Sequence, residues 1–407
     1  MTYPCILNIV QPRIAFWLLL PLLLALATIA QLLFESAGDK PDLFWTWSSA
    51  GQKERLTRAR ELAMTDDVKS QSVSDIAAPL LSTRPWSPVR WCDLAELYEA
   101  EGNLAVAERF FNQATELGGP MPLVWIRKAN FHWRRGDGEQ ALAAFRTALA
   151  IPSPYQPAIY VALDGLQQPQ ERIFREIVSI NRRAATDYLL YRIRTKSAEN
   201  IPTLWRMFVE EHGTDEKLAA SVSMKLWAAG NREESLRVWS EATGESPASA
   251  DLSGHWLPSP FAWRCDGCGE VQMSRTEEKP EELTLIFPGH LNRQFDGLKK
   301  ILDLPAGTYE LRFRWKGNGE RYKEGAQFVV RQALNRKVVL ARSGDLLGAS
   351  GWTDEQIAFH LDRRSFVELG FIRAPFRRVA GHEQSRLSIT DLSLNQRNVT
   401  ERTVATR

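Results

Sequence analysis

Residues 91–114, WCDLAELYEAEGNLAVAERFFNQA, decide the fold of the first half of the chain, because their pattern recurs thirty-four residues later in residues 125–148, WIRKANFHWRRGDGEQALAAFRTA. Six positions match in register, namely Trp91, Ala95, Gly102, Ala107, Phe111 and Ala114 in the first stretch and Trp125, Ala129, Gly136, Ala141, Phe145 and Ala148 in the second. A repeat of this length indicates a supersecondary unit that buries its apolar face only by stacking on its neighbours. The sequence therefore predicts stacked helix pairs.

Each stretch divides into two helical stripes around a glycine. The stripe of the first helix consists of Trp91, Leu94, Ala95 and Tyr98. Gly102 with Asn103, and Gly136 with Asp137, then provide the turns. A second helix packs its alanines and one phenylalanine against the first helix. We expect these aromatic residues and alanines to hold helix against helix, and not to contact a ligand.

These residues resemble the tetratricopeptide repeat, whose pattern of Trp, Leu, Gly or Ala and Tyr, followed by Ala, Phe and Ala, is present here. The resemblance implies an α-solenoid over residues 50–245, with a concave groove that binds a segment of a partner protein. Residues 58–82 would supply a degenerate unit ahead of Pro85. Another unit, displaced from the register, runs from Leu226 through Ser235 and Trp239 to Ala242, and between residues 152 and 212 the pattern fades.

The composition bounds the class of protein. The chain has 407 residues, of which 44% are hydrophobic and 25% charged, and its formal net charge is +2, which predicts a globular chain of more than one domain. Fifty-one basic residues against forty-nine acidic ones leave no surplus for a nucleic-acid partner. Four cysteines do not make a disulfide-dense scaffold, and six histidines offer little for metal or acid–base chemistry.

The N-terminus carries an apolar segment, Ile14–Phe34, of twenty-one residues without a charge. Such a helix spans a hydrocarbon core of roughly 30 Å. We expect residues 1–12 to be cytoplasmic and residues 13–34 to be a transmembrane anchor, with a cleaved signal peptide as the alternative. Either one sends the rest of the chain across a membrane, because Arg13 precedes the segment and acidic residues prevail just after it.

Strand-like runs replace the helical period beyond Gly244. In the clearest run, Tyr309–Lys316, the aromatic and leucine side chains alternate with Arg312, Arg314 and Lys316, so that one face is apolar. Further runs are Leu283–Phe287, Gln327–Gln332, Lys337–Arg342, Gln356–Leu361, Ser365–Arg373 and Arg386–Leu394. The sequence predicts an antiparallel β-sandwich over residues 253–396 and a disordered polar tail over 397–407.

The order of these features resembles the jelly-roll domains of the carbohydrate-binding-module type. The residues that carry the resemblance are Phe261–Trp263, Leu283–Phe287, Leu304–Tyr309, Leu347–Gly348, Gly351–Trp352 and Ile389–Leu394. An anchor, tetratricopeptide-like repeats and this sandwich together resemble bacterial envelope proteins associated with exopolysaccharide or O-antigen assembly. The resemblance implies a context at the periplasmic side of the inner membrane, and it carries no catalytic motif.

Glycan recognition needs an aromatic platform for the sugar ring and polar groups for its hydroxyls. The candidate platforms are Trp315, Tyr322 and Trp352, although Trp315 alternates with arginines and suits the core, and Trp352 suits a plug of the sandwich equally well. The candidate polar contacts are Arg312, Arg314, Gln327, Arg331 and Glu368, which could line the face opposite the core or simply form a solvated sheet face. Asp391 alone does not make a calcium site, so we predict no metal.

Cys265-Asp266-Gly267-Cys268 is the sharpest local motif. An Asp-Gly pair suits a two-residue hairpin turn, which would bring Cys265 and Cys268 within disulfide distance. Zinc would need two more ligands, such as His255 and His290. A pair of free thiols and a redox pair also stay open. We expect a local disulfide.

The sequence thus predicts a membrane-anchored periplasmic adaptor without catalytic activity or cofactor. No phosphate-binding loop, Gly-x-Ser-x-Gly elbow or His-Glu-x-x-His motif is present in the sequence. We expect protein partners from a polysaccharide assembly system and no nucleic acid. Two further functions stay open, a glycan-binding protein that acts through the jelly roll and a polysaccharide-modifying enzyme.

Overall fold

The computed structural model describes most of the chain beyond the N-terminal fifth. The described residues are 81, 84–195, 198–276, 278–288, 294–318, 326–346, 348–374 and 385–397. Outside them lie the predicted anchor, nearly all of the degenerate repeat at 58–82, His290, Tyr322, Leu347 and residues 398–407 of the predicted tail. The first residue of that predicted tail, Arg397, instead ends the last strand. Among the helices of the described part, none is both long and apolar enough to cross a membrane.

The chain divides into two compact units, and the boundary between them in the sequence falls between Tyr155 and Gln156. The change from helices to strands comes only after residue 244, so the compact units do not coincide with the two classes of secondary structure. The later helices belong to the same unit as the strands.

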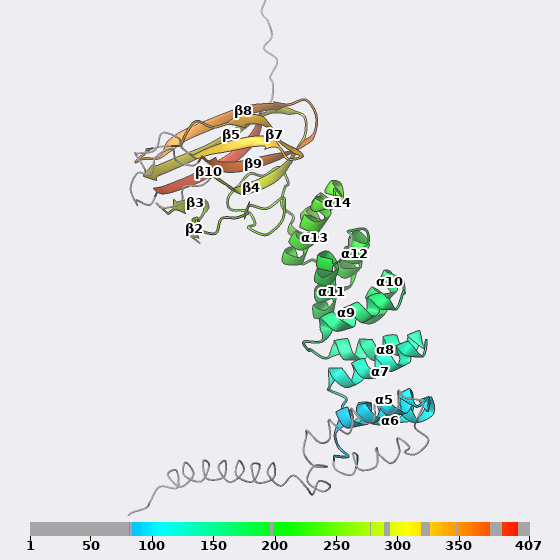
Figure 1. Cartoon of the computed structure of the whole chain (residues 1–407). Coiled ribbons are helices and arrows are strands. Elements are labelled where there is room, and N and C mark those ends of the chain that lie inside the picture. Colours follow the sequence, from blue (N-terminus) through cyan, green and yellow to red (C-terminus); the bar gives the residue numbers. More distant parts are fainter. Residues whose placement is uncertain are drawn as a thin grey trace, which may run out of the picture. The chain divides into compact units, whose positions relative to one another are not determined.

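The described part of unit 1 forms two helix pairs (Figure 1). The helices are α5 (Pro88–Ala100), α6 (Leu104–Leu117), α7 (Pro122–Arg134) and α8 (Gly138–Ala150). The start of α7 lies thirty-four residues after that of α5, and the start of α8 thirty-four residues after that of α6. The repeat in the sequence is therefore a repeat of helix pairs.

The turns of both helix pairs combine a left-handed glycine with an N-cap residue. Gly102 and Gly136 have φ values of +79° and +78°, in the left-handed region that glycine enters at little cost. Asn103 and Asp137 follow as N-caps, and each side chain accepts a hydrogen bond from the backbone N–H three residues ahead. These local signals explain why a single sequence suffices to predict the pairs.

Most repeat residues lie in the core of their helix pairs. The side chains without exposed area are Ala95, Ala107, Phe111, Ala114, Ala129, Ala141, Phe145 and Ala148. Trp91, Tyr98 and Trp125 are only half-buried, and the rings of Trp91 and Tyr98 lie 5.0 and 5.1 Å from the ring of Phe110. The indole N–H groups of Trp91 and Trp125 donate to backbone carbonyls six residues earlier, so both tryptophans also fix the entry to their helices.

Unit 2 begins with helices, and those that end by residue 212 lie in the segment where the repeat pattern fades. They are α9 (Gln156–Gly165), α10 (Gln170–Ile173), the π-helical turn η1 (Phe174–Val178), α11 (Arg182–Thr195), α12 (Ile201–His212), α13 (Glu216–Ala228) and α14 (Arg232–Thr243). A π-helical turn inserts an extra residue into the helical register. The thirty-four-residue period is lost here although helices continue.

The pair α13–α14 repeats the geometry of unit 1. Gly230 has a φ of +87° in the turn between the helices. Ser235 and Trp239 are fully buried, and they follow Gly230 at the same distances at which Ala107 and Phe111 follow Gly102. The displaced repeat that the sequence indicated at Leu226–Ala242 is therefore a helix pair of the same kind.

Two antiparallel sheets complete unit 2. The strands are β1 (Arg264–Cys265), β2 (Gln272–Thr276), β3 (Lys279–Phe287), β4 (Phe295–Leu304), β5 (Gly307–Asn318), β6 (Ala326–Gln332), β7 (Asn335–Arg342), β8 (Thr353–Leu361), β9 (Ser365–Arg373) and β10 (Ser385–Arg397). Sheet A has the order β1-β4-β9-β6-β7, and sheet B the order β2-β3-β10-β5-β8. One apolar core holds side chains from both sheets.

The core confirms the alternation read from Tyr309–Lys316. Tyr309, Leu311, Phe313 and Trp315 are all at most 5% exposed and belong to the common core. Trp315 is therefore inside the sandwich, and it is not a platform for a sugar. The segment between α14 and β1 also packs, because Ala250 and Leu252 join the same core. The stretch between the predicted solenoid and the predicted sandwich, residues 245–253, is thus a packed connection between helices and strands.

The sequence did not reveal β1, β2 and β4. The reason is clearest for β4, in which Lys299 and Lys300 interrupt the apolar alternation. Lys300 pairs with Leu369 across the strands and lies on the core side of sheet A with no exposed area. Its Nζ donates to Oε1 of Glu245 at 2.8 Å, and this salt bridge compensates the buried charge.

Candidate ligand-binding face of the sandwich

The predicted glycan contacts divide between the two sheets. Arg312 and Arg314 lie on β5 of sheet B, and Trp352 immediately precedes β8 of the same sheet. Gln327, Arg331 and Glu368 lie on β6 and β9 of sheet A. The expectation that the polar residues share one face is therefore wrong, because the chain crosses from sheet B to sheet A between β5 and β6.

The outer face of sheet A is partly covered by the last helix pair. Ile301 of β4 and Phe366 of β9 form an apolar cluster with Trp239 of α14 and Phe261. The ring of Trp227, at the end of α13, lies 5.2 Å from the ring of Phe366 and 5.6 Å from that of Phe261. This cluster buries part of the sheet A face against protein and makes that part unsuitable for a ligand.

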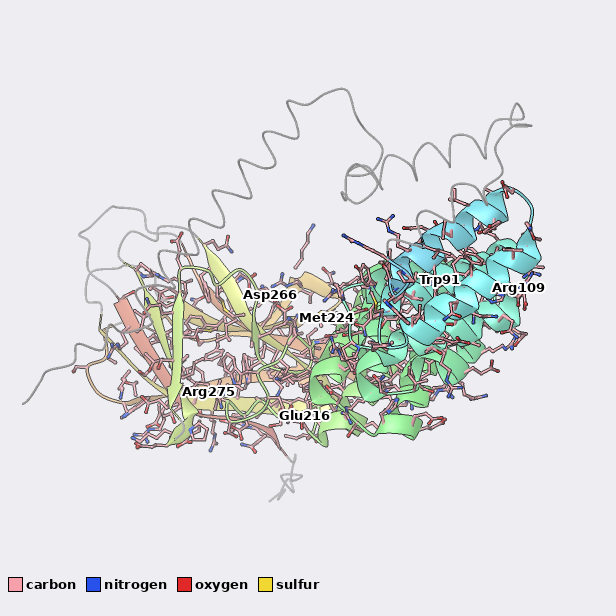
Figure 2. The ribbon with its side chains drawn as sticks, turned by 90° about the horizontal axis from the view of Figure 1, so that it is seen from below. Trp91, Arg109, Glu216, Met224, Asp266 and Arg275 are labelled. Carbon is pink, nitrogen blue, oxygen red and sulfur yellow. A yellow bond between two sulfur atoms is a disulfide. The ribbon has the colours of Figure 1, made fainter. Side chains whose placement is uncertain are left out.

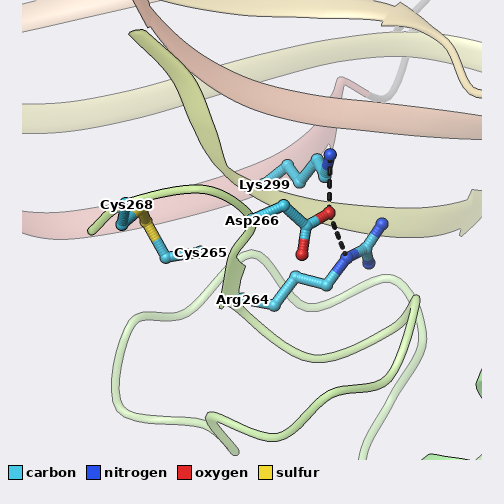
Figure 3. Close-up of a disulfide and its surroundings, with 5 residues drawn as sticks. All are labelled: Arg264, Cys265, Asp266, Cys268 and Lys299. Carbon is cyan, nitrogen blue, oxygen red and sulfur yellow. Dashed lines mark hydrogen bonds and ion pairs between the residues drawn. A yellow bond between two sulfur atoms is a disulfide. The ribbon is translucent and has the colours of Figure 1, made fainter.

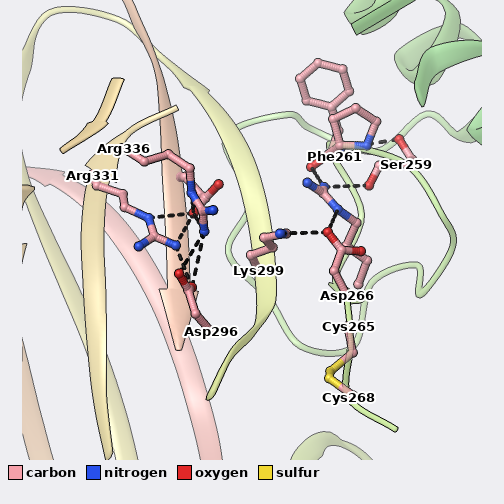
Figure 4. Close-up of polar contacts among 12 residues, drawn as sticks. Ser259, Phe261, Cys265, Asp266, Cys268, Asp296, Lys299, Arg331 and Arg336 are labelled. Carbon is pink, nitrogen blue, oxygen red and sulfur yellow. Dashed lines mark hydrogen bonds and ion pairs between the residues drawn. A yellow bond between two sulfur atoms is a disulfide. The ribbon is translucent and has the colours of Figure 1, made fainter. Parts of the chain in front are cut away.

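A polar cluster continues the same face beyond the apolar one (Figure 4). Arg331 donates to Glu368 and to Asp296, both at 2.6 Å, and Arg336 reaches the same two carboxylates. Burial opposes the charge of Arg331, but the hydrogen bonds to Asp296 and Glu368 raise its pKa. Arg331 and Glu368 are only 8% and 4% exposed, so they tie β6, β9 and β4 together and have little surface for a sugar.

The Cys265–Cys268 motif forms a disulfide at the edge of sheet A (Figure 3), with Cα atoms 5.6 Å apart. Gly267 has a φ of +73°, as a tight Asp-Gly turn requires. The turn does not join two paired strands, because β1 pairs with β4 and the chain then enters β2 in the other sheet. The expected hairpin is therefore absent from this segment, and with both sulfurs in the disulfide neither remains as a zinc ligand.

The disulfide turn rests against a glycine of β4. Asp266 N–H donates to the carbonyl of Gly297 at 2.9 Å, and a Cβ at Gly297 would lie 2.8 Å from Sγ of Cys268. The Asp266 carboxylate pairs with Lys299 at 2.7 Å and Arg264 at 3.3 Å. Burial opposes the charge of Asp266, but these two cations lower its pKa overall. A pocket of about 220 Å³ adjoins this turn.

The outer face of sheet B carries a shallow hollow of about 750 Å³, here called the sheet B trough. Its lining residues are Arg312, Phe313, Arg314, Asp354, Glu355, Gln356, Asp391 and Ser393. Arg312 lies between Gln356 of β8 and Ser393 of β10 in the strand register. Arg312 is therefore flanked by an amide side chain on one neighbouring strand and by a hydroxyl side chain on the other. The apolar cluster around α13 and α14 includes no described residue of this sheet.

A β-bulge shapes one wall of the trough. The register of β10 against β5 shifts between Thr390 and Ser393, and Asp391 has a φ of +55°. A bulge of this kind redirects a side chain from the regular alternation. Oδ2 of Asp391 lies 3.4 Å from Arg314, and Asp354 lies 3.7 Å from the same guanidinium group on the other side.

Trp352, which is half-buried, contacts Arg314 of the trough through its ring. Nζ of Lys316 lies 4.2 Å from the centre of its ring, and the Arg314 guanidinium carbon lies 5.7 Å away. These cation–π contacts hold the indole beside the trough. A sugar ring that stacked on Trp352 would have to use the side of the indole that Lys316 does not occupy.

Two carboxylates, those of Asp354 and Asp391, face the trough, so the option of an enzyme is not removed. Asp354 and Asp391 both contact Arg314, and Oε1 of Glu355 accepts a hydrogen bond from the backbone N–H of Gly344 at 3.1 Å. This arrangement offers hydrogen-bond acceptors beside guanidinium donors. It is suited to holding several hydroxyl groups.

In unit 1, most charged residues of the first helices pair with one another. Arg127 of α7 contacts Asp93 and Glu96 of α5 at 2.9 and 2.7 Å, and Arg134 contacts Glu99. Burial opposes the charge of Arg127, but the Glu96 and Asp93 carboxylates raise its pKa. These pairs tie one repeat to the next. Figure 2 shows Trp91 and Arg109 on the two helices of the first pair.

Several trough residues carry no direct signal in the sequence. Asp354, Glu355, Gln356 and Ser393 were not among the predicted contacts, because their proximity to Arg312 depends on which strands pair. The outward alternation within Gln356–Leu361 was visible, but the pairing of β5 with β8 and β10 was not. Gln327 lies on sheet A and donates to Asp345 at 2.8 Å, away from the trough.

The helical half of the chain and the β-sandwich each have low similarity to known structures. YrrB, described as a TPR protein with an unusual peptide-binding site, is 15% identical, with a TM-score of 0.22, and the match covers 41% of this chain and 91% of that one. The MamA protein is 11% identical with a TM-score of 0.20, covering 47% of this chain and 92% of that one. A structure described as CBM4 is 12% identical with a TM-score of 0.25, covering 34% of this chain and 88% of that one.

No protein-family model and no curated protein matches the sequence. The structural similarities are too low to support an argument about function. The description as helix pairs followed by a two-sheet β-sandwich therefore rests on the structure of this chain.

Proposed function

We propose that the chain is a non-enzymatic adaptor of the bacterial envelope, which binds a glycan in the sheet B trough and a protein partner through its helix pairs. The anchor at residues 13–34 would hold it at the inner membrane, with the remainder in the periplasm. Its partners would belong to exopolysaccharide or O-antigen assembly, as the resemblance of the sequence implies. Protection of the chain from protease in intact cells, and its loss in spheroplasts, would test this location.

The observation that carries the glycan proposal is the difference between the two outer faces of the sandwich. The outer face of sheet A is partly occupied by α13, α14 and buried ion pairs. Sheet B presents guanidinium, carboxylate, amide and hydroxyl groups around a hollow, with Trp352 beside it. A ligand with many hydroxyls can use such donors and acceptors at once.

The test is glycan binding by the full-length chain in detergent, measured by affinity electrophoresis against a panel of polysaccharides. We expect Arg314→Ala to weaken binding by about tenfold, the effect of losing about 1.4 kcal/mol of interaction. Arg109→Ala, on α6 of unit 1, is the matched control and should bind as the wild type does. Equal binding by the wild type and Arg314→Ala would contradict a site in the trough.

A second function, binding of a protein segment, is favoured by apolar side chains exposed on unit 1. They are Trp86, Leu104, Met121, Trp133 and Tyr155, with exposed fractions between 36% and 81%. Such residues are typical anchors at protein interfaces. We expect Trp133→Ala to reduce co-purification of the partner with the full-length chain without affecting glycan binding.

The structure also determines how a deletion should be designed. Removal of residues 50–245 would take away α13, α14 and Glu245, which would uncover Ile301 and leave Lys300 unpaired in the core. Removal of residues 81–155 spares these contacts and takes away only unit 1 pairs. We expect the shorter deletion to lose the protein partner and to keep glycan binding. Retention of the partner would contradict a role for unit 1.

A further inference from the structure

The charged side chains of the sheet B trough indicate which class of glycan it accepts. This inference rests on the glycan-binding function proposed above. The side chains on the trough face include two cations, Arg312 and Arg314, and two carboxylates, Asp354 and Asp391. Glu355 pairs with the core residue Phe313 in the strand register, and its carboxylate accepts a hydrogen bond from Gly344. The side chains of Asp354 and Asp391 are 91% and 55% exposed, whereas that of Arg314 is 46% exposed. Both aspartates are therefore more accessible to a ligand than Arg314, and Asp354 is also more accessible than Arg312, which is 61% exposed.

Each cation of the trough already has an acidic partner. Arg314 lies between Asp354 and Asp391. Arg312 contacts Glu310 at 3.1 Å, and Lys316, beside the trough, contacts Glu282 at 3.5 Å while it also lies on the Trp352 ring. A carboxylate, sulfate or phosphate on a sugar would have to displace one of these partners, and it would meet the remaining carboxylates at short range. Like charges placed together in this way disfavour the wrong ligand.

An uncharged sugar avoids this conflict. Each hydroxyl group donates one hydrogen bond and accepts others, so it can donate to Asp354 or Asp391 and accept from Arg314 without separating the ion pairs. Gln356 and Ser393, on the strands flanking β5, can donate as well as accept. We propose that the sheet B trough selects uncharged glycans, and that Asp354 and Asp391 exclude acidic ones by occupying Arg314.

The decisive experiment exposes the arginine. In the double variant Asp354→Asn, Asp391→Asn, both side chains keep their shape and lose their charge, which removes the two carboxylates that contact Arg314. Asp362→Asn is the matched control, because its side chain is 98% exposed on the turn before β9 and it lies outside the trough lining. The readout is affinity electrophoresis of the full-length chain in detergent, with neutral glucans, mannans and galactans and with alginate and polygalacturonate.

We expect the wild type to bind a neutral polysaccharide and to bind the two polyuronates at least about tenfold more weakly. The double variant should gain about tenfold for the polyuronates, and added salt should abolish this gain, whereas Asp362→Asn should show none. Wild-type binding that is tighter to a polyuronate than to every neutral polymer would overturn the selection. So would a double variant whose polyuronate affinity equals that of Asp362→Asn.

The two proposals fail in different ways. If the wild type binds no polymer of either class, the proposed glycan function fails. The gain of polyuronate binding in the double variant then still decides whether the two aspartates keep Arg314 from anions. A gain in that case supports the exclusion, and its absence overturns it.

Discussion

The two outer faces of the sandwich are built from the same kind of strand but are used differently. On sheet A, apolar residues such as Ile301 and Phe366 contact the last helix pair, and Arg331 and Glu368 are buried in ion pairs. On sheet B, Arg312 and Arg314 keep 61% and 46% of their side-chain surface exposed. One face therefore stabilises the junction between helices and strands, and the other is available for a ligand. Mutations on sheet A should affect stability, and mutations on sheet B should affect binding.

The largest loss of stability is expected from the buried salt bridge between Lys300 and Glu245, on the core side of sheet A. Glu245→Ala would leave Lys300, which has no exposed area, without its carboxylate. Removing one partner of a buried ion pair typically costs about 3–5 kcal/mol. We expect a loss of stability of this size for unit 2, measured by urea unfolding of the full-length chain followed by tryptophan fluorescence.

A compensating variant separates the charge from other effects at this position. In Lys300→Met with Glu245→Gln, both charges are gone and the volume is nearly kept, so most of the lost stability should return. His255 contacts the other oxygen of Glu245 at 3.3 Å, and the glutamine can still hydrogen-bond to it. If the double variant is as unstable as Glu245→Ala, the cost does not come from the unpaired lysine.

The second largest loss of stability is expected when an outward side chain of sheet A is shortened, and an outward side chain of sheet B provides the comparison. Ile301→Ala removes a side chain that is 2% exposed and packed between β4 and the helices, which should cost about 2–4 kcal/mol. Arg314→Ala on sheet B should change stability by no more than about 0.5 kcal/mol, because its partners Asp354 and Asp391 are themselves exposed. The measurement is again urea unfolding of the full-length variants. Comparable losses from both variants would show that the two faces do not differ in their contribution to stability.

These comparisons also show what the sequence could predict. The helix pairs of unit 1 were predictable because their signals are local, namely Gly102 and Gly136 in the turns and the alanines at fixed distances from them. The core side of β5 was predictable from alternation alone. The strand β4 was not, because Lys300 makes sense only beside Glu245, which lies fifty-five residues earlier in the chain.

The candidate site was predictable only in part, for a related reason. Arg312 and Arg314 could be identified as outward residues of one strand, but Gln327, Arg331 and Glu368 could not be assigned to the other sheet without the strand order. The position of Asp391 depends on a bulge that no pattern in the sequence marks. Residues of one strand can be sorted by alternation, whereas a site made of three strands requires their register.

A smaller loss of stability is expected when the disulfide at the edge of sheet A is removed. Cys265→Ser with Cys268→Ser removes a disulfide that closes a loop of only four residues, for which the chain-entropy estimate is about 2 kcal/mol. The loss of stability should therefore be smaller than that of Ile301→Ala. Glycan binding in the sheet B trough should stay unchanged, because the disulfide lies on the other sheet. A loss of binding in this variant would mean that the two faces are coupled.

The smallest change in stability is expected when acid weakens the ion pairs of Glu310 on sheet B. The hydrogen bonds from Arg397 and Arg312 lower the pKa of Glu310 to about 2, from an ordinary value of 4.5. A carboxyl group with a lowered pKa in the folded state contributes stability fully above its ordinary value, and this contribution disappears as the pH falls towards 2. We therefore expect Glu310→Gln to lose less stability than the wild type between pH 4.5 and 2, measured by urea midpoints.

Salt distinguishes this ion pair from the pairs of sheet A. Arg312 and Arg397 are more than half exposed, so about 0.5 M salt should screen their attraction to Glu310 and reduce the difference between wild type and Glu310→Gln. Arg331 and Glu368 are buried, and the same salt should change the effect of Glu368→Gln much less. Equal salt sensitivity of the two variants would contradict the division of the sandwich into a buried structural face and an accessible one.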